Sequence, residues 1–272
     1  MRIPVLCYHS QIISANDYRG NGHIALARDL QHFTEQQWRV VPLSWVVEWQ
    51  RGQRDDADLK QAIAISFDDG MLSDFQGVQH PEFGALAGFL PIMEAFHHSA
   101  AGQQQPHLHA TSFVITSDRA RRDIDRACNQ GIGWDNNQIW QQLRDHPLIS
   151  LENHSWDHNH ETCNDSAAYP QGTFVSVHNF DLCEHEVRRA SQHLQVQHAI
   201  QAKLFAYPYG QASHYISDRY LPQHGPSMGL EAAFTTAGEY VDQQQSPWLL
   251  PRFVHGHHWR TPEELSQLLA QA

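Results

Sequence analysis

The sequence has few basic residues and no cluster of them. Its 272 residues include 18 Lys and Arg against 30 Asp and Glu, which gives a formal net charge of -12. A protein that binds a nucleic-acid backbone or an anionic membrane surface needs clustered positive side chains. We therefore expect neither nucleic acid nor an anionic membrane as a partner.

Long apolar runs and an export signal are missing as well. No run approaches the roughly 20 apolar residues that cross a bilayer, so no membrane span is predicted. The chain enters a strand-like run at residue 3, without the charged region, apolar region and cleavage site of a secretory leader. The sequence as given is predicted to be cytoplasmic, although a periplasmic or secreted chain whose leader had been removed would look the same.

Cysteine is scarce and scattered. The four residues, Cys7, Cys128, Cys163 and Cys183, form no CxxC pair. This spacing suggests neither a zinc knuckle nor a dense disulfide framework. We expect buried or incidental thiols.

Short apolar runs alternate with segments of helical period, which is typical of βα units around a mainly parallel sheet. The expected strands are residues 3–8, 62–67, 110–115, 148–152, 203–207, 231–236 and 249–254. Helices are expected at 25–38, 44–52 with Ser44 at its start, 89–98, 135–146, 181–199 and 261–272, and loops at 101–109 and 162–174. No GxGxxG follows the first strand, which disfavours a doubly wound sheet. We predict one domain, residues 1–272, folded as a distorted (β/α)7-type barrel.

Polar residues follow three of the expected strands. Asp68 and Asp69 follow the second, His154 and His158 follow the fourth, and Tyr209 lies in a Pro-Tyr-Gly turn after the fifth. The carboxyl ends of barrel strands open onto one mouth, so these side chains are expected to lie close together.

Two imidazoles and one carboxylate, with an open position for water, are the ligand set of a catalytic Zn²⁺ or a similar divalent ion. A second, adjacent aspartate could then accept a proton. Alone, an Asp-Asp-Gly sequence is most often a turn, and an HxxxH spacing is a weak signal in a chain with 21 histidines. Their joint occurrence at strand ends favours a site.

Four segments resemble a known family, the NodB-type polysaccharide deacetylases of carbohydrate esterase family four. SFDDG (66–70) resembles the family's first motif, HSWDH (154–158) its second and FAYPYG (205–210) its third, and PVLCYHS (4–10) resembles the strand that begins many members. The resemblance implies a distorted βα barrel and a metal-dependent hydrolase that removes acetyl groups from N-acetylated, or sometimes O-acetylated, sugars.

The resemblance also implies roles for single residues. Asp69, His154 and His158 would bind one divalent ion, with Zn²⁺ expected first and Co²⁺ or Ni²⁺ as alternatives. Asp68 would be the general base, and Tyr209 would offer its backbone N–H to the developing oxyanion.

The sequence departs from the family pattern in three places. Ala206 stands where the third motif commonly has an arginine that orients the base, and Arg252 is the candidate replacement, with a surface salt bridge as its alternative role. Asn159 and His160 follow the second motif, where the family usually has a proline. We expect His160 to be exposed, with a fourth metal ligand or a group that contacts a ligand as its alternative roles. The late motif that carries the general acid has no clean match. His255 is the first candidate, with His257 and His258 as the others, and His9, at the end of the first expected strand, could face the same mouth.

Two other functions fit the same residues. One is a C–N hydrolase of a small amide or cyclic ureide on the same scaffold, although relatives of that kind generally have degraded metal motifs. The other is a non-catalytic protein that binds metal or carbohydrate, which would account for Ala206 and the many histidines. Neither the identity of the sugar nor the oligomeric state follows from the sequence.

Overall fold

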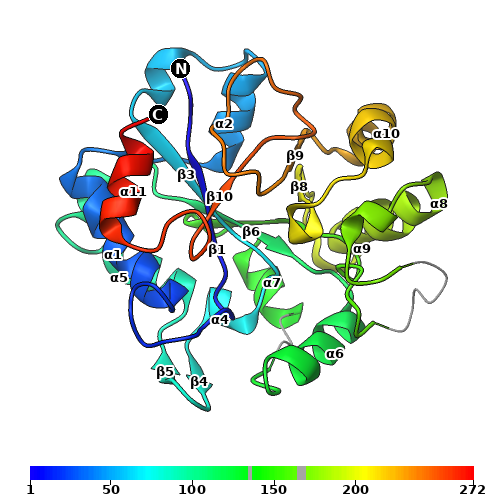
Figure 1. Ribbon diagram of the computed structural model, residues 1–272, viewed down its shortest axis with the longest axis horizontal. Helices are drawn as coiled ribbons and strands as arrows, with labels where there is room; N and C mark the ends of the chain where they lie inside the picture. Colours follow the sequence, from blue (N-terminus) through cyan, green and yellow to red (C-terminus); the bar gives the residue numbers. More distant parts are fainter. Residues whose placement is uncertain (134–136, 164–169) are drawn as a thin grey trace.

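The computed structural model describes residues 1–133, 137–163 and 170–272. Among them, parallel strands form one sheet in the order β10-β1-β3-β6-β7-β8-β9, and β2 pairs with the edge of β3 outside this path. Figure 1 shows these strands running through the middle of the molecule. Their bounds are Val5–Tyr8 (β1), Arg39–Val40 (β2), Ala62–Phe67 (β3), Ala110–Val114 (β6), Ile149–Asn153 (β7), Leu204–Ala206 (β8), Ala232–Phe234 (β9) and Phe253–Val254 (β10).

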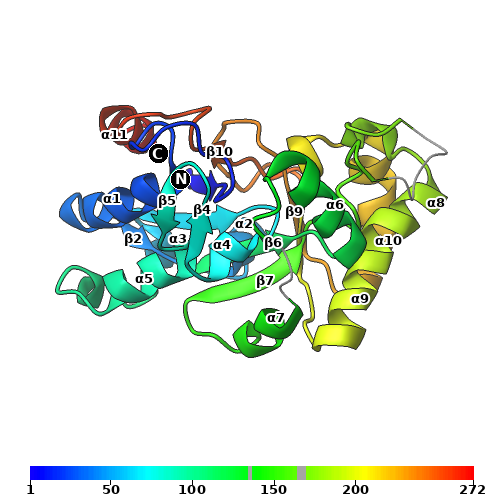
Figure 2. The ribbon, with the colours of Figure 1, turned by 90° about the horizontal axis from the view of Figure 1, so that it is seen from below.

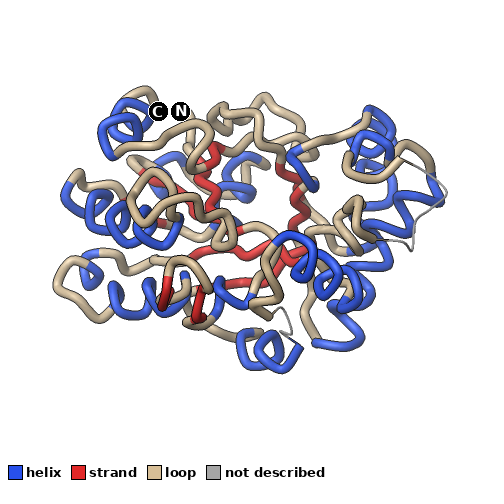
Figure 3. Tube along the Cα trace, turned by 60° about the horizontal axis from the view of Figure 1, so that its bottom comes forward, coloured by secondary structure: helices blue, strands red, loops and turns tan. Residues whose placement is uncertain are grey.

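The sheet curls until its two edges meet. Phe234, at the end of β9, forms a parallel bridge with Leu250, just before β10. The backbone N–H of Thr235 donates to the Leu250 carbonyl at 2.8 Å, and that of Gly238 donates to the Arg252 carbonyl at 3.0 Å. The predicted distorted barrel is confirmed, and Figure 3 shows the strands as an arc inside a layer of helices.

Alternate residues of each strand face opposite sides of the sheet, as the two-residue period requires. Val5, Ala64 and Phe113 belong to a core cluster that α2 (Leu43–Gln50) joins. Their neighbours Leu6 and Ile65 belong to the larger cluster that includes the outer helices. Because both faces of these strands are buried, the sequence shows continuous apolar runs there.

Helices surround the sheet, as Figure 2 shows. The longer ones are α1 (Gly22–Glu35), α5 (Phe89–His97), α6 (Asp118–Cys128), α7 (Asn137–Leu143), α9 (Arg189–His198), α10 (Leu221–Met228) and α11 (Pro262–Leu269). Shorter ones are α3 (Asp56–Leu59), α4 (Leu72–Phe75) and α8 (Phe180–Cys183), and π-helical turns at Glu184–Arg188 and Ile216–Tyr220 precede α9 and α10. No helix of the described part of the chain has the length and apolar character that a membrane span requires.

The structure differs from the sequence-based expectation in several elements. All seven predicted strands are present, but β2, α3, α4, α6, α10 and the antiparallel pair β4 (Val78–His80) and β5 (Gly84–Leu86) were not predicted. A 3-10 turn at Gly102–Gln104 lies within one predicted loop. The second helix begins at Leu43 and not at Ser44, because the carbonyl of Pro42 accepts its first backbone bond, from Trp45 N–H at 3.0 Å. Residues 135–136 of one predicted helix and 164–169 of one predicted loop lie outside the described residues.

The predicted start of the last helix is confirmed. Thr261 accepts a hydrogen bond from the Glu264 N–H, and Pro262 occupies the first helical position. The cysteines are all free, and three of the four are buried, as expected.

Candidate active site

The turn after β3 separates two adjacent aspartates. Asp69 has a φ of 77°, in the left-handed region, and Gly70 follows with a φ of 68°. A Cβ at Gly70 would lie 2.6 Å from Cγ1 of Val114, so only glycine fits this close approach to β6. The turn therefore directs Asp68 and Asp69 to different partners at the end of the sheet.

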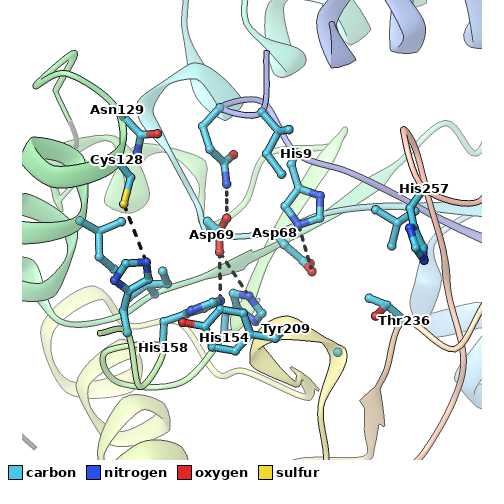
Figure 4. Close-up of a pocket in the computed structure, with 17 residues that line it drawn as sticks. His9, Asp68, Asp69, Cys128, Asn129, His154, His158, Tyr209, Thr236 and His257 are labelled. Carbon is cyan, nitrogen blue, oxygen red and sulfur yellow. Dashed lines mark hydrogen bonds and ion pairs between the residues drawn. The ribbon is translucent and has the colours of Figure 1, made fainter. Parts of the chain in front are cut away.

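The loop after β7 brings two histidines to Asp69. His154 Nε2 lies 3.4 Å and His158 Nε2 lies 3.5 Å from Asp69 Oδ1. Figure 4 shows the three side chains pointing toward one another. Ser155 and His158 both have positive φ values, which cost energy for residues other than glycine. The loop is held in this shape because the His158 N–H donates to Ser155 Oγ at 2.8 Å.

The donor atoms of this triad fit a metal ion. His154 Nδ1 lies 2.8 Å from the carbonyl oxygen of Ala206, so Nδ1 carries the hydrogen and the lone pair of Nε2 faces Asp69. An imidazole lone pair and a carboxylate oxygen repel each other, and a metal ion bound to both would remove this repulsion. One ligand atom from each of the three residues lies within 4.8 Å of the others. The set matches a catalytic zinc site with two nitrogens and one oxygen.

The pKa shifts of the three side chains also fit a metal ion at this position. Burial raises the pKa of Asp69, but His154 and His158 outweigh it and hold the pKa well below its usual range. Burial lowers the pKa of His158 to about 3, which keeps the ring neutral and able to act as a ligand. Burial disfavours charged His154, yet Asp68 and Asp69 raise its pKa, because the carboxylates attract a positive charge to this position.

Asp68 forms a buried pair with Arg252. Arg252 Nη1 donates to Asp68 Oδ1 at 2.6 Å, and Nη2 donates to Oδ2 at 2.8 Å. Arg252 is fully buried and Asp68 is 3% exposed, so the pair is no surface salt bridge. Burial raises the pKa of Asp68, but Arg252 dominates and lowers it to about 2. Arg252 thus gives Asp68 the guanidinium partner that position 206, an alanine in this chain, does not provide.

The turn after β8 adds a third wall. Tyr209 has a φ of 57°, and its ring lies against the His158 ring with centroids 4.4 Å apart. A Cβ at Gly210 would lie 1.9 Å from Thr236 Oγ1, so glycine is required beside this tyrosine. Tyr209 is 40% exposed and lines the cavity at the strand ends.

The cavity in front of these residues has a volume of about 560 Å³, within the range of small-molecule sites. Its lining includes the polar residues Asp68, Asp69, His154, His158 and Tyr209 and the apolar residues Ile12, Ile115, Ile124 and Val254. The sequence-predicted residues from three strand ends are therefore brought together.

His255 is not brought to this cavity. Its Nε2 lies 3.0 Å from the Tyr18 carbonyl oxygen, and its ring stacks on Tyr8 with centroids 5.8 Å apart. The His255 N–H donates to the Cys7 carbonyl, so the pairing with β1 continues through His255. Side chains alternate between the two faces of a strand, so His255 faces outward where Arg252 faces inward. Two other histidines, His257 and His9, line the cavity.

Sequence reasoning missed some residues of the site and left the role of His160 open. Gln11 donates through Nε2 to Asp69 Oδ2, and Thr236 lines the cavity beside Gly210. Neither belongs to a motif, and only their positions after strands β1 and β9 could have indicated them. His160 is half-buried at the cavity wall, and not exposed as expected, with Nε2 3.9 Å from Cys128 Sγ.

Comparisons with known proteins show the family and the fold of the chain. A family model described as polysaccharide deacetylase matches residues 55–225. Similar solved structures include IcaB from Ammonifex degensii (TM-score 0.68, 18% identity, 99% of this chain and 96% of that one), the Streptococcus pyogenes deacetylase PplD in complex with acetate (0.65, 14%, 99% and 98%) and a de-N-acetylase from Aggregatibacter actinomycetemcomitans (0.64, 15%, 98% and 100%). At these identities the likeness shows the shared fold. A search of curated protein sequences gives no significant match.

Proposed function

Because the chain belongs to the polysaccharide deacetylase family, we propose that it is a metal-dependent hydrolase that removes acetyl groups from N-acetylated carbohydrate. O-acetylated carbohydrate is the alternative substrate. The observation that carries the proposal is the convergence of Asp69, His154 and His158 beside the buried pair of Asp68 and Arg252. The three candidate ligands and the separate carboxylate of Asp68 line the same cavity.

Asp69, His154 and His158 would hold the ion. A bound Zn²⁺, or Co²⁺ or Ni²⁺ with the same ligands, would supply Lewis-acid chemistry and lower the pKa of water. His154 is already fixed for this role, since the Ala206 carbonyl selects the tautomer whose Nε2 is free to bind metal.

Asp68 serves as the general base. Its low pKa keeps it ionised at neutral pH, so it can take a proton from the attacking water. Arg252 holds both carboxylate oxygens in a fork and so fixes the direction of Asp68. Arg252 therefore acts as a positioning residue in place of the arginine that is missing at Ala206.

The turn at Tyr209 and a histidine complete the reaction. The backbone N–H of Tyr209 stabilises the negative charge that develops on the acetyl oxygen. The departing amine needs a proton, and His257 is the candidate donor because it lines the cavity, whereas His255 faces Tyr8 and Tyr18. His9, with Nε2 3.9 Å from Asp68 Oδ2, is the second candidate.

Acetate release from N-acetylated oligosaccharides tests the proposal. The protein is stripped of metal, reloaded with Zn²⁺, Co²⁺ or Ni²⁺, and compared with Asp68→Asn. We expect metal-dependent release that Asp68→Asn abolishes. If metal is bound and no acetylated sugar releases acetate, the substrate assignment is wrong, and a parallel screen of small amides and cyclic ureides then tests the second candidate function.

A further inference from the structure

A second, smaller cavity adjoins the one that holds the ligand triad. Its volume is about 110 Å³, and it lies against the β4–β5 hairpin, which the chain inserts between β3 and β6. Gln11, Cys128 and Asn129 line both cavities, so the two are direct neighbours. Figure 1 shows the hairpin and α6, which ends at Cys128, at the same end of the molecule. A chain-like substrate in the first cavity could therefore extend into the second.

The hairpin cavity offers an aromatic face and a directed hydrogen-bond donor. Phe83 packs beside His80, with ring centroids 4.8 Å apart. His80 Nδ1 accepts the backbone N–H groups of Glu82 and Phe83, both at 3.1 Å, so the hydrogen of the neutral ring is on Nε2. An aromatic face with a few placed polar groups suits the apolar face and the hydroxyl groups of a sugar ring.

The charged side chains that the structure describes in the two cavities are all acidic. Among the described residues that line the two cavities, the charged ones are Asp68, Asp69 and Glu82, and none is Lys or Arg. Glu82 is exposed on the hairpin, whereas the Asp68 charge is matched by the buried Arg252 behind it. A divalent ion would offset the Asp69 charge in the first cavity, so the unmatched negative charge is that of Glu82 in the hairpin cavity, which repels acidic sugars such as uronates and attracts an ammonium group.

We propose that the hairpin cavity binds the sugar unit next to the one being deacetylated, and that Glu82 favours a unit that carries a free amino group. This rests on the proposed function and narrows its substrate class. The substrate is then an amino-sugar oligomer that is already partly deacetylated, and neither a single acetylated sugar nor an acidic polysaccharide.

Equilibrium binding of a glucosamine tetramer, which has no acetyl group to lose, tests the proposal without turnover. At low salt we expect Glu82→Gln to raise Kd about threefold and Glu82→Lys about tenfold, because an exposed ion pair contributes modestly. The differences should largely vanish at about 0.5 M salt. Glu35→Gln, which removes another exposed carboxylate, at the end of α1, should leave Kd unchanged. Affinity for the fully N-acetylated tetramer should differ less than twofold among all four proteins.

Hydrolysis of 4-nitrophenyl acetate, which has no neighbouring sugar unit to bind in the hairpin cavity, is measured on the same proteins and should not change with substitution of Glu82. If Kd for the glucosamine tetramer is the same in the wild type, Glu82→Gln and Glu82→Lys, the hairpin subsite is refuted, whatever the hydrolysis shows. If the Kd series follows the charge of residue 82 while no acetyl compound is hydrolysed, the subsite is supported and the hydrolase proposal fails.

Discussion

Arg252, at the last strand, donates to both carboxylate oxygens of Asp68, at the end of β3, over 2.6 and 2.8 Å. The two residues are 184 positions apart, and no local pattern links them. The pair lies inside the barrel, where an unpaired carboxylate would take up a proton. Arg252 therefore decides whether Asp68 is ionised and where it points.

Arg252→Lys keeps the positive charge but loses the fork, so we expect kcat/KM to fall by about 100-fold with little change in KM. Arg252→Gln removes the charge as well. Burial then raises the pKa of Asp68 from about 2, so the acid limb of the kcat/KM profile moves to higher pH. Profiles of both variants check this, with circular dichroism to establish folding. An acid limb that does not move in Arg252→Gln contradicts the assignment of Asp68 as base.

The two histidines after β10 should behave differently. His257→Gln should lower kcat about 100-fold on an N-acetylated oligosaccharide, because the amine leaves only with a proton. It should have little effect on 4-nitrophenyl acetate, whose phenolate leaves without one. His255→Gln should leave both rates within about threefold and lower the melting temperature instead, because its ring packs on Tyr8 and Trp259. Equal losses on both substrates in His257→Gln would argue against its role as the acid.

Gly70 and Gly52 form a matched pair. Both have positive φ values, but a Cβ at Gly70 would meet Val114 at 2.6 Å, whereas a Cβ at Gly52 would meet nothing within 4 Å. Gly52→Ala should cost about 1 kcal/mol of unfolding free energy and leave activity unchanged. Gly70→Ala should cost more and displace Asp69, which lowers metal affinity. Isothermal titration with Zn²⁺ measures the metal affinity of each variant, and chemical denaturation measures its unfolding free energy. Equal metal affinity in the two variants would contradict the role given to Gly70.

Glu152 in β7 should make stability depend on pH. Burial raises its pKa to about 8, although the N–H groups of Leu204 and Lys203 lower it. The folded protein thus keeps a proton that the unfolded chain loses near its ordinary pKa, so stability declines as the pH rises from about 4.5 to about 8. Glu152→Gln removes this loss. We expect the variant to gain stability relative to the wild type, on the order of 2 kcal/mol at pH 8, and a smaller gain at pH 5. A gain that is the same at both values would refute the prediction.

The sequence predicts the strands well because their physical origin is local. A strand buried on both faces needs an apolar side chain at nearly every position, and Ala62–Phe67 shows this directly. The elements that were missed lack such a signal. β2 has two residues, β4 and β5 have three residues each, and α6 buries only Ala120, Arg121, Ile124 and Asp125 on one face.

The site divides in the same way. Asp68, Asp69, His154, His158 and Tyr209 each follow a recognisable strand, so their convergence follows from the barrel. The choice between His255 and His257 depends on the turn that follows β10, because His257 lies in this turn and not in a strand, and the turn was not read from the sequence. The alternation from an inward Arg252 through Phe253 and Val254 places His255 outward, but it does not extend to His257, whose N–H donates to the Val254 carbonyl in the turn.

The ligand triad is the central claim, and locating the ion is its most direct test. Crystals grown with Zn²⁺ should give one strong anomalous peak at the zinc edge, about 2.0 to 2.2 Å from Asp69, His154 Nε2 and His158 Nε2. Metal analysis should give one ion per chain, and His158→Ala should lose it. A peak elsewhere in the molecule, or no peak at these residues with zinc in excess, would contradict the account.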